Sequence, residues 1–167
     1  MKIEIDDTYK DLRYVVLMTR MGHRCGYVGV SNESILYGKN YQNDIPIRIG
    51  DMLNQPVGKR GVLNLLSMLG KDEDDNINIG CFFNVHGGIT YSGSGEDDYP
   101  VPSSLWWFGY DCGHAGDGRD LSVLDDEERE IFSRSIFPGD VIRTKEYCIE
   151  ECKSLIDQIK KLEEILK

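Results

Sequence analysis

Two histidines occupy similar positions in the sequence, each beside a glycine. His86 ends an apolar stretch and precedes Gly87 and Gly88, and His114 follows Gly113. A glycine beside a histidine removes side-chain bulk, so a ligand or a second chain segment can approach the backbone. Successive N–H groups in a glycine turn can also bind an anion. The pattern predicts that both histidine segments contribute to a ligand site, and hydrogen bonding of the histidines to loop carbonyls is the competing interpretation.

Two aspartates flank His114 and, with the histidines, form a mixed nitrogen and oxygen set. Asp111 precedes His114 by three residues and Asp117 follows it by three. Zinc, manganese and iron bind to such sets. This spacing on a loop does not force the side chains together, unlike two histidines one turn apart on a helix. We favour a site without a cofactor, and the alternative is a divalent metal held by His86, Asp111, His114 and Asp117.

Aromatic residues stand close to these polar groups. Flat rings stack on nucleobases for about 1–3 kcal/mol per base, without any net positive charge on the protein. In the expected strand Leu105–Asp111, alternation places Trp107 on the face of Asp111, whereas Trp106 is expected in the core. The predicted ligand-binding residues are therefore His86, Gly87, Gly88, Tyr91, Trp107, Asp111, His114 and Asp117.

Several familiar chemistries lack their sequence patterns. GxSxG, GxxxxGK[ST] and GxGxxG are all absent, so the serine hydrolase elbow and the Gly-rich nucleotide loops are not supported. The five cysteines form no CxxC pair, which is typical of reduced thiols rather than of a zinc ribbon or a disulfide framework. Cys148 and Cys152 lie on the apolar stripe of the last helix, so we expect them to be buried, and metal ligation by this pair is the alternative. Cys112 near His114 is a weak candidate for a nucleophile, because neighbours on a loop need not meet.

The elements that would position these residues are short strands followed by helices. Strands are expected at Arg13–Thr19, Gly26–Val30, Ile77–Val85, Ile89–Tyr91 and Leu105–Asp111. Turn glycines between them, such as Gly22, indicate hairpins, and no regular alternation of strands and helices is present. The sequence thus predicts an α+β fold with a largely antiparallel sheet.

Two helices are expected near the C-terminus, at Leu124–Arg134 and from Thr144, as N-cap, to the end of the chain. In the second helix, apolar residues recur every three or four positions from Cys148 to Leu166. Such a stripe is typical of a helix packed on a sheet, and a heptad dimer is the alternative.

Length and charge limit the classes of protein. A chain of 167 residues fits one domain, in which residues 42–78, with a short helix expected at Val62–Leu69, form a possible insertion. A net charge of −10 argues against general nucleic-acid binding, because binding to phosphates needs clustered Lys and Arg. Long apolar runs and a signal peptide are missing, so we expect a cytoplasmic protein that does not enter a membrane.

Four blocks in order, GYVGV, LYGKNY, VHGGITYSG and WWFGYDCGHAGD, resemble a family of small proteins encoded by bacteriophages and prophages. The resemblance covers about half of the chain and implies an accessory protein that acts against host defence in the cytoplasm of an infected bacterium. Relative to that family the chain is longer between LYGKNY and VHGGIT, which is the reason to expect an insertion at 42–78.

Three functions follow as hypotheses. The favoured one is a protein that binds and sequesters a small nucleotide-derived immune signal without converting it. The second is a metal-dependent hydrolase that cleaves a phosphoester or glycosidic bond in such a signal. The third is an inhibitor that binds a host protein through the C-terminal helix or the acidic surface. Because sites between subunits are common in symmetric assemblies, a homo-oligomer stays open.

Overall fold

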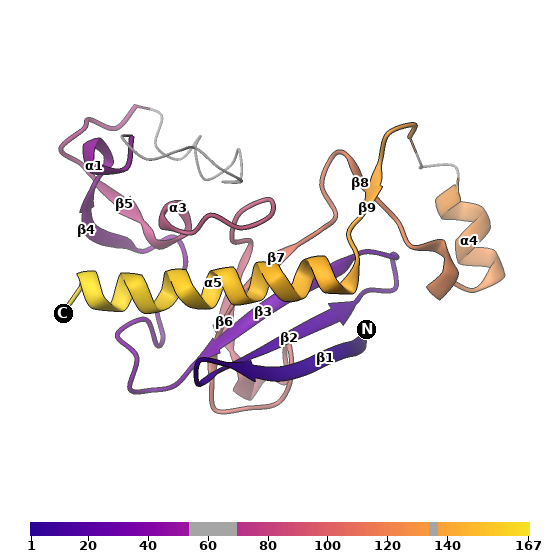
Figure 1. Cartoon of the computed structure of the whole chain (residues 1–167), viewed down its shortest axis with the longest axis horizontal. Coiled ribbons are helices and arrows are strands. Elements are labelled where there is room, and N and C mark those ends of the chain that lie inside the picture. Colours follow the sequence, from indigo (N-terminus) through magenta and orange to yellow (C-terminus); the bar gives the residue numbers. More distant parts are fainter. Residues whose placement is uncertain (54–69, 134–136) are drawn as a thin grey trace.

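A five-stranded antiparallel sheet crossed by the long C-terminal helix α5 (Lys145–Ile165) is the framework of the molecule (Figure 1). The structure, a computed structural model, describes residues 1–53, 70–133 and 137–167. In spatial order the strands are β1 (Lys2–Tyr9), β2 (Leu12–Met18), β3 (Arg24–Val30), β7 (Trp106–Asp111) and β6 (Tyr91–Ser94). The predicted α+β fold with a largely antiparallel sheet is therefore confirmed.

The hairpin β2–β3 carries the centre of the sheet, as the sequence predicted. Its turn contains Gly22 at φ +79°, a conformation that favours glycine. A Cβ atom on Gly26 would overlap the ring of Tyr110 on β7, so only glycine allows the two strands to pair here. Strand β1 was not predicted, because this edge strand is mostly exposed and its acidic residues hide the alternation of its apolar ones.

Helix α5 covers one face of the sheet with the apolar stripe read from the sequence. Thr144 caps it as predicted, since its hydroxyl accepts a hydrogen bond of 3.1 Å from the backbone N–H of Tyr147. The residues buried along the stripe are Cys148, Cys152, Leu155, Ile156, Ile159 and Leu162. They join the main core with Phe108 and Tyr110, so the stripe packs within this chain rather than against a heptad partner.

The chain between β3 and β6 contains a separate two-stranded sheet made by β4 (Asp44–Arg48) and β5 (Asn76–Asn78). Helix α1 (Ile49–Leu53) follows β4, and helix α3 (Ile79–Phe82) follows β5. The expected strand Ile77–Val85 was wrong beyond residue 78, because the Asn78 side chain caps the N–H of Cys81 and starts a helical turn. An apolar run of this length does not distinguish a strand from a buried helix. The helix expected at Val62–Leu69 lies outside the described residues.

The remaining elements lie between β6 and α5. They are η1 (Gly95–Asp97), β8 (Asp117–Gly118), η2 (Leu121–Val123), α4 (Asp126–Ser133) and β9 (Val141–Ile142). Strand β8 pairs in parallel with β9 and thereby holds the loop after β7 against the chain that leads into α5 (Figure 1). The expected helix at Leu124–Arg134 is confirmed within two residues. Across the described ranges, no helix is both long and apolar enough to cross a membrane.

The prediction for the two adjacent tryptophans holds for one of them, because Trp106 packs against the main core as expected, whereas Trp107 is not open to a ligand. Trp107 is fully buried in a second apolar cluster with Val15, Leu17 and Tyr27, on the sheet face away from α5. Trp106 is only partly buried, and its indole N–H donates to the carbonyl of Lys39. The residues from 95 to 105 cover the face that carries Trp107, and that long-range packing was not visible in the local pattern.

Candidate functional site

The segments that carry His86 and His114 converge, although 28 residues separate them in the sequence. The two imidazole rings lie 5.7 Å apart between centroids. Gly87 has φ +66°, and a Cβ atom on it would overlap the His114 ring at Cε1. The glycine after His86 is therefore needed both for the backbone conformation and for the approach of the second histidine.

Asp117 is the centre of this cluster, and its side chain is only 2% exposed. Its Oδ2 atom lies 2.7 Å from His86 Nε2 and accepts a hydrogen bond of 3.1 Å from the backbone N–H of His114. Its Oδ1 atom accepts from Arg143 Nε at 2.8 Å. Burial alone would raise the pKa of Asp117, but the bonds from Arg143, His86 and His114 outweigh it, so the pKa lies below its usual value. Asp117 is thus an ionised carboxylate in a nearly dry position.

The other polar atoms of His86 contact the first turns of α5. Its Nδ1 atom lies 3.1 Å from the hydroxyl of Tyr147, and its backbone N–H donates to Glu151 at 2.9 Å. Tyr147 and Glu151 are four residues apart and so share one face of the helix. Both nitrogens of the His86 ring are therefore engaged, which fixes the orientation of the ring between Asp117 and Tyr147.

The imidazole of His114 is held less tightly than that of His86. Its Nδ1 atom is buried and has no hydrogen-bond partner among the residues that the structure describes. It lies 3.8 Å from Asp111 Oδ1 and 3.7 Å from Asp117 Oδ2, both beyond hydrogen-bond distance. The Asp111 carboxylate instead accepts from the hydroxyl of Thr90 at 3.0 Å and from the N–H of Gly113 at 3.0 Å.

A cavity of about 250 Å³ adjoins the cluster. Its walls are the loop from Cys112 to Arg119, with His23 on one side and Phe137 and Asp140 on the other. Burial lowers the pKa of His23 below its usual value, which favours a neutral ring. Like His114, His23 has a buried Nδ1 atom for which the described part of the chain supplies no partner. The cavity is therefore lined by two histidines, by the glycines of the loop, by Arg119 and by the carboxylate residues Asp117 and Asp140.

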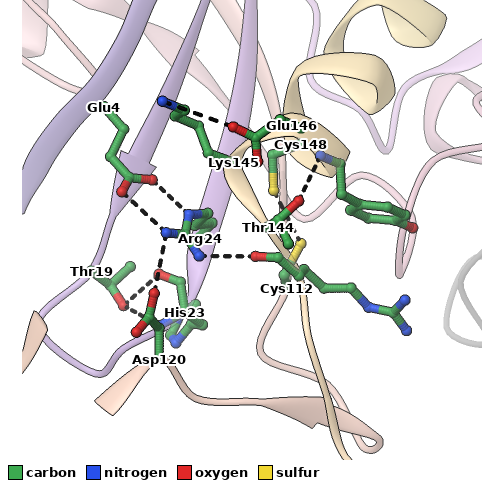
Figure 2. Close-up of polar contacts among 12 residues, drawn as sticks. Glu4, Thr19, His23, Arg24, Cys112, Asp120, Thr144, Lys145, Glu146 and Cys148 are labelled. Carbon is green, nitrogen blue, oxygen red and sulfur yellow. Dashed lines mark hydrogen bonds and ion pairs between the residues drawn. The ribbon is translucent and has the colours of Figure 1, made fainter. Parts of the chain in front are cut away.

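An ion-pair network around the buried Arg24 connects the segments that lead into the site (Figure 2). Arg24 donates to Glu4 at 2.6 Å, to the carbonyl of Arg143 at 3.0 Å and to Asp120 at 3.3 Å. The register of β1 against β2 shifts between Ile3 and Ile5, an irregularity at Glu4, the residue that meets Arg24. Arg24 thus joins β1, the loop after β8 and the entry to α5, the segment that carries Arg143.

Two of the predicted ligand residues lie away from the cluster. Trp107 is fully buried, so it offers no ring face to a ligand in this structure, and its N–H donates to Ser103 at 2.9 Å. Tyr91 packs edge-on against Tyr27 and Tyr99 at 5.7 and 5.0 Å between ring centroids. This arrangement does not support base stacking on Trp107, because the sheet face that carries it is covered by its own chain.

Several residues of the site escaped the sequence reasoning. The β2–β3 turn supplies His23, and the loop after β8 supplies Arg119. Arg143 lies just before α5, and Tyr147 lies in the first turn of that helix. The only local signal was the pair of polar residues, Tyr147 and Glu151, four apart at the start of an otherwise apolar helix face. The thiols, by contrast, were predicted correctly, as all five cysteines are free and buried. Cys112 is not a candidate nucleophile, because its contact with Cys148 at 3.8 Å and its burial raise the pKa of its thiol (Figure 2).

Comparisons with known proteins give no further guide to this site. No protein-family model, no curated protein and no solved structure matches the chain. The site is therefore interpreted from its own geometry.

Proposed function

We propose that the protein binds and sequesters a small nucleotide-derived ligand, of the kind used as a bacterial immune signal, in the cavity beside the histidine cluster. The observation that carries the proposal is the cavity itself, which adjoins the histidine cluster through His114 and Asp117 and is walled by His23, Arg119 and the glycine-rich loop. Ligand sites are typically concave and contain a few convergent polar groups. The resemblance of the sequence blocks to phage proteins is the basis for the ligand class.

The cavity wall carries Arg119 and two carboxylates, Asp117 and Asp140, and both carboxylates already accept hydrogen bonds from the chain. The carboxylate of Asp117 is already paired with Arg143, which limits its repulsion of a phosphate. Arg119 uses one guanidinium nitrogen for the carbonyl of Met21 at 2.7 Å, and its guanidinium carbon lies 4.8 Å from the centroid of the Phe132 ring. Its remaining N–H groups would have to turn toward the cavity to bind a ligand. At about 250 Å³ the cavity is below the usual range of about 300–1,000 Å³ for drug-sized ligands. We therefore expect it to enclose the phosphate and ribose.

The base is expected outside the enclosed part of the cavity. Phe137 lines the cavity and is 68% exposed, so its ring is accessible to a ligand. A nucleobase stacked on this ring would gain about 1–3 kcal/mol. In this proposal Phe137, rather than Trp107, stacks on the nucleobase.

The experiment is to incubate the protein with a panel of cyclic oligonucleotides and ADP-ribose derivatives and to separate free from bound ligand by size. Mass spectrometry of the filtrate and of the heat-denatured protein then identifies each species. Intact ligand released only on denaturation supports sequestration. Arg119→Gln should weaken retention, whereas Arg48→Gln, at an exposed arginine on β4, serves as the matched control.

Hydrolysis of the same class of ligand is the second candidate function. It is favoured by the grouping of His86, His114 and Asp117, whose ligand atoms lie within 4.8 Å of one another and which could hold a divalent metal. A converted product in the filtrate would establish it. An untouched panel would reject both nucleotide functions and leave the third hypothesis, inhibition of a host protein through the acidic surface.

A further inference from the structure

We propose that His86, His114 and Asp117 bind a divalent transition metal of the zinc class through His86 Nε2, His114 Nδ1 and Asp117 Oδ2. The ligand atoms that the three residues offer lie within 4.8 Å of one another. Imidazole nitrogen and carboxylate oxygen are, with thiolate, the groups that zinc binds in proteins. This inference goes beyond the proposed function, because a metal here would serve either a binder or a hydrolase.

One of the distances between the proposed ligand atoms is close to that of a tetrahedral site, and a second must lengthen. Two ligands at about 2.0–2.1 Å from one zinc ion, at a tetrahedral angle, stand about 3.4 Å apart. His114 Nδ1 and Asp117 Oδ2 are 3.7 Å apart, so an ion fits between them with little movement. His86 Nε2 and Asp117 Oδ2, at 2.7 Å, must separate to about that spacing when the ion replaces the proton between them.

The unpaired nitrogen of His114 is the second, independent observation. Buried polar atoms in native structures nearly always have a partner, and an exception points to an ion or a water molecule. His114 Nδ1 is buried and unpaired with respect to the described residues, yet two carboxylates lie just beyond hydrogen-bond reach at 3.7 and 3.8 Å. An ion in that space would give the nitrogen its missing partner.

The contacts behind the ligands favour the protonation states that a metal requires. A metal-bound histidine usually donates its other ring N–H to an oxygen. In His86 that oxygen is the hydroxyl of Tyr147 at 3.1 Å, so the proton can reside on Nδ1 and leave Nε2 free.

Asp117 is prepared in a similar way. Arg143 holds its Oδ1 atom at 2.8 Å and, despite burial, helps to keep the carboxylate ionised. Oδ2 then faces the two imidazoles. Arg143 also repels a cation, and Asp111, whose carboxylate is 3.8 Å from His114 Nδ1, partly offsets that repulsion. The cluster borders the cavity through His114 and Asp117, so a fourth metal position would open toward a water molecule or ligand.

The test uses the full-length chain, stripped of metal by a chelator and dialysed against Zn²⁺ alone. Elemental analysis measures the metal bound, and competition with a chelator gives the dissociation constant. We expect one zinc ion per wild-type chain. His114→Ala should weaken binding more than about 100-fold, since outer partners alone change affinity by about 10–100-fold. Because the Nδ1 atom of His114 makes no hydrogen bond within the described chain, the metal-free variant should melt close to the wild type.

Two further variants separate a metal site from a general effect on the cavity. His23→Ala removes the other buried imidazole on the cavity wall but no proposed ligand, and it should retain zinc. Tyr147→Phe removes only the hydroxyl at His86 Nδ1 and should weaken zinc binding about 10-fold. The proposal is overturned if the wild type binds no zinc, if His114→Ala binds as tightly as wild type, or if His23→Ala loses as much affinity as His114→Ala. Because zinc is the only probe, failure here leaves the nucleotide proposal standing.

Discussion

At the scale of single residues, the site depends on side chains with more than one contact. Asp117 joins both histidine segments to Arg143, and His86 is fixed between Asp117 and Tyr147. The sequence singled out Asp117 and His86 by their types and by their neighbouring glycines. It contained no information about Arg143 or Tyr147, because these reach the site only through the placement of α5.

Gly87→Ala should be more destabilising than an alanine at an unobstructed glycine. Gly38, at φ +73°, has no atom near its would-be Cβ, whereas at Gly87, at φ +66°, that Cβ would overlap His114. Both substitutions carry a left-handed backbone penalty of about 1–2 kcal/mol. Gly87→Ala should add about 1–3 kcal/mol from overpacking. Urea unfolding compares the two variants, and equal losses of free energy of unfolding would contradict the contact between the two histidine segments.

His23 should make stability fall in mildly acidic solution. Burial is the main cause of its lowered pKa, and Arg119 and His114 act in the same direction, whereas Asp111 and Asp117 oppose them. The unfolded chain, with an ordinary histidine pKa of about 6.5, then binds more protons than the folded protein as the pH falls through that value. Stability is therefore lost between pH 6.5 and the lower, folded pKa of His23.

The variant His23→Gln lacks the titrating imidazole and therefore lacks this pH-dependent loss of stability. Its melting temperature should fall less than that of the wild type between about pH 7.5 and about pH 5.5. Differential scanning calorimetry at the two pH values provides the comparison. Parallel losses in both proteins would show that His23 titrates normally in the folded state.

At the scale of elements, the Arg24 network connects parts that are far apart in the sequence. It fastens β1 at the Glu4 irregularity, the loop after β8 and the carbonyl that precedes the cap of α5 (Figure 2). The start of α5 carries Tyr147, so the network also sets the position of a site residue. The sequence predicted both β3 and α5 correctly, and it could not predict this connection, because Glu4, Arg24 and Arg143 show no spacing that links them.

Arg24→Met is expected to be strongly destabilising. It removes a guanidinium that is 9% exposed and leaves Glu4, at 14%, without its partner. Breaking a buried pair in this way costs about 3–5 kcal/mol. The matched control is Arg13→Met, which breaks an ion pair between β2 and β1 whose side chains are 34% and 37% exposed, for about 0–1 kcal/mol. Chemical denaturation measures the free energy of unfolding of both variants. Similar losses in the two variants would contradict the burial of the Arg24 ion pair.

At the scale of the whole molecule, one core holds the sheet, α5 and the short elements around β4 and β5 together. Ile45, Ile77 and Ile79 of that region are buried in the same cluster as Ile159 and Leu162 of α5. The possible insertion at 42–78 thus contributes to the common core where the structure describes it. That residues 42–78 are an insertion stays a prediction, and so does the formation of a homo-oligomer.

Deleting Asp157–Lys167 should prevent folding rather than remove a binding surface. The deletion takes away Ile159 and Leu162, which are fully buried, and each large apolar truncation in a core costs about 2–5 kcal/mol. That loss is large against a typical domain stability of about 5–15 kcal/mol. Circular dichroism should show no cooperative melting, whereas deletion of the exposed Lys167 alone should change little. If the truncated protein still folds, the hypothesis that α5 binds a host protein is favoured instead.

The sequence by itself determined the fold class, the β2–β3 hairpin, the capped amphipathic helix, the reduced state of the five cysteines and the two histidine segments beside glycines. These features depend on local periodicity, capping and turn chemistry, which neighbouring residues decide. Only the tertiary structure decided that the His86 and His114 segments meet, that Trp107 rather than Trp106 is enclosed, and that Ile79–Phe82 is helical. Each of these depends on which distant segment covers a face, and the residues from 95 to 105 and the start of α5 exert their effect through space rather than through sequence spacing.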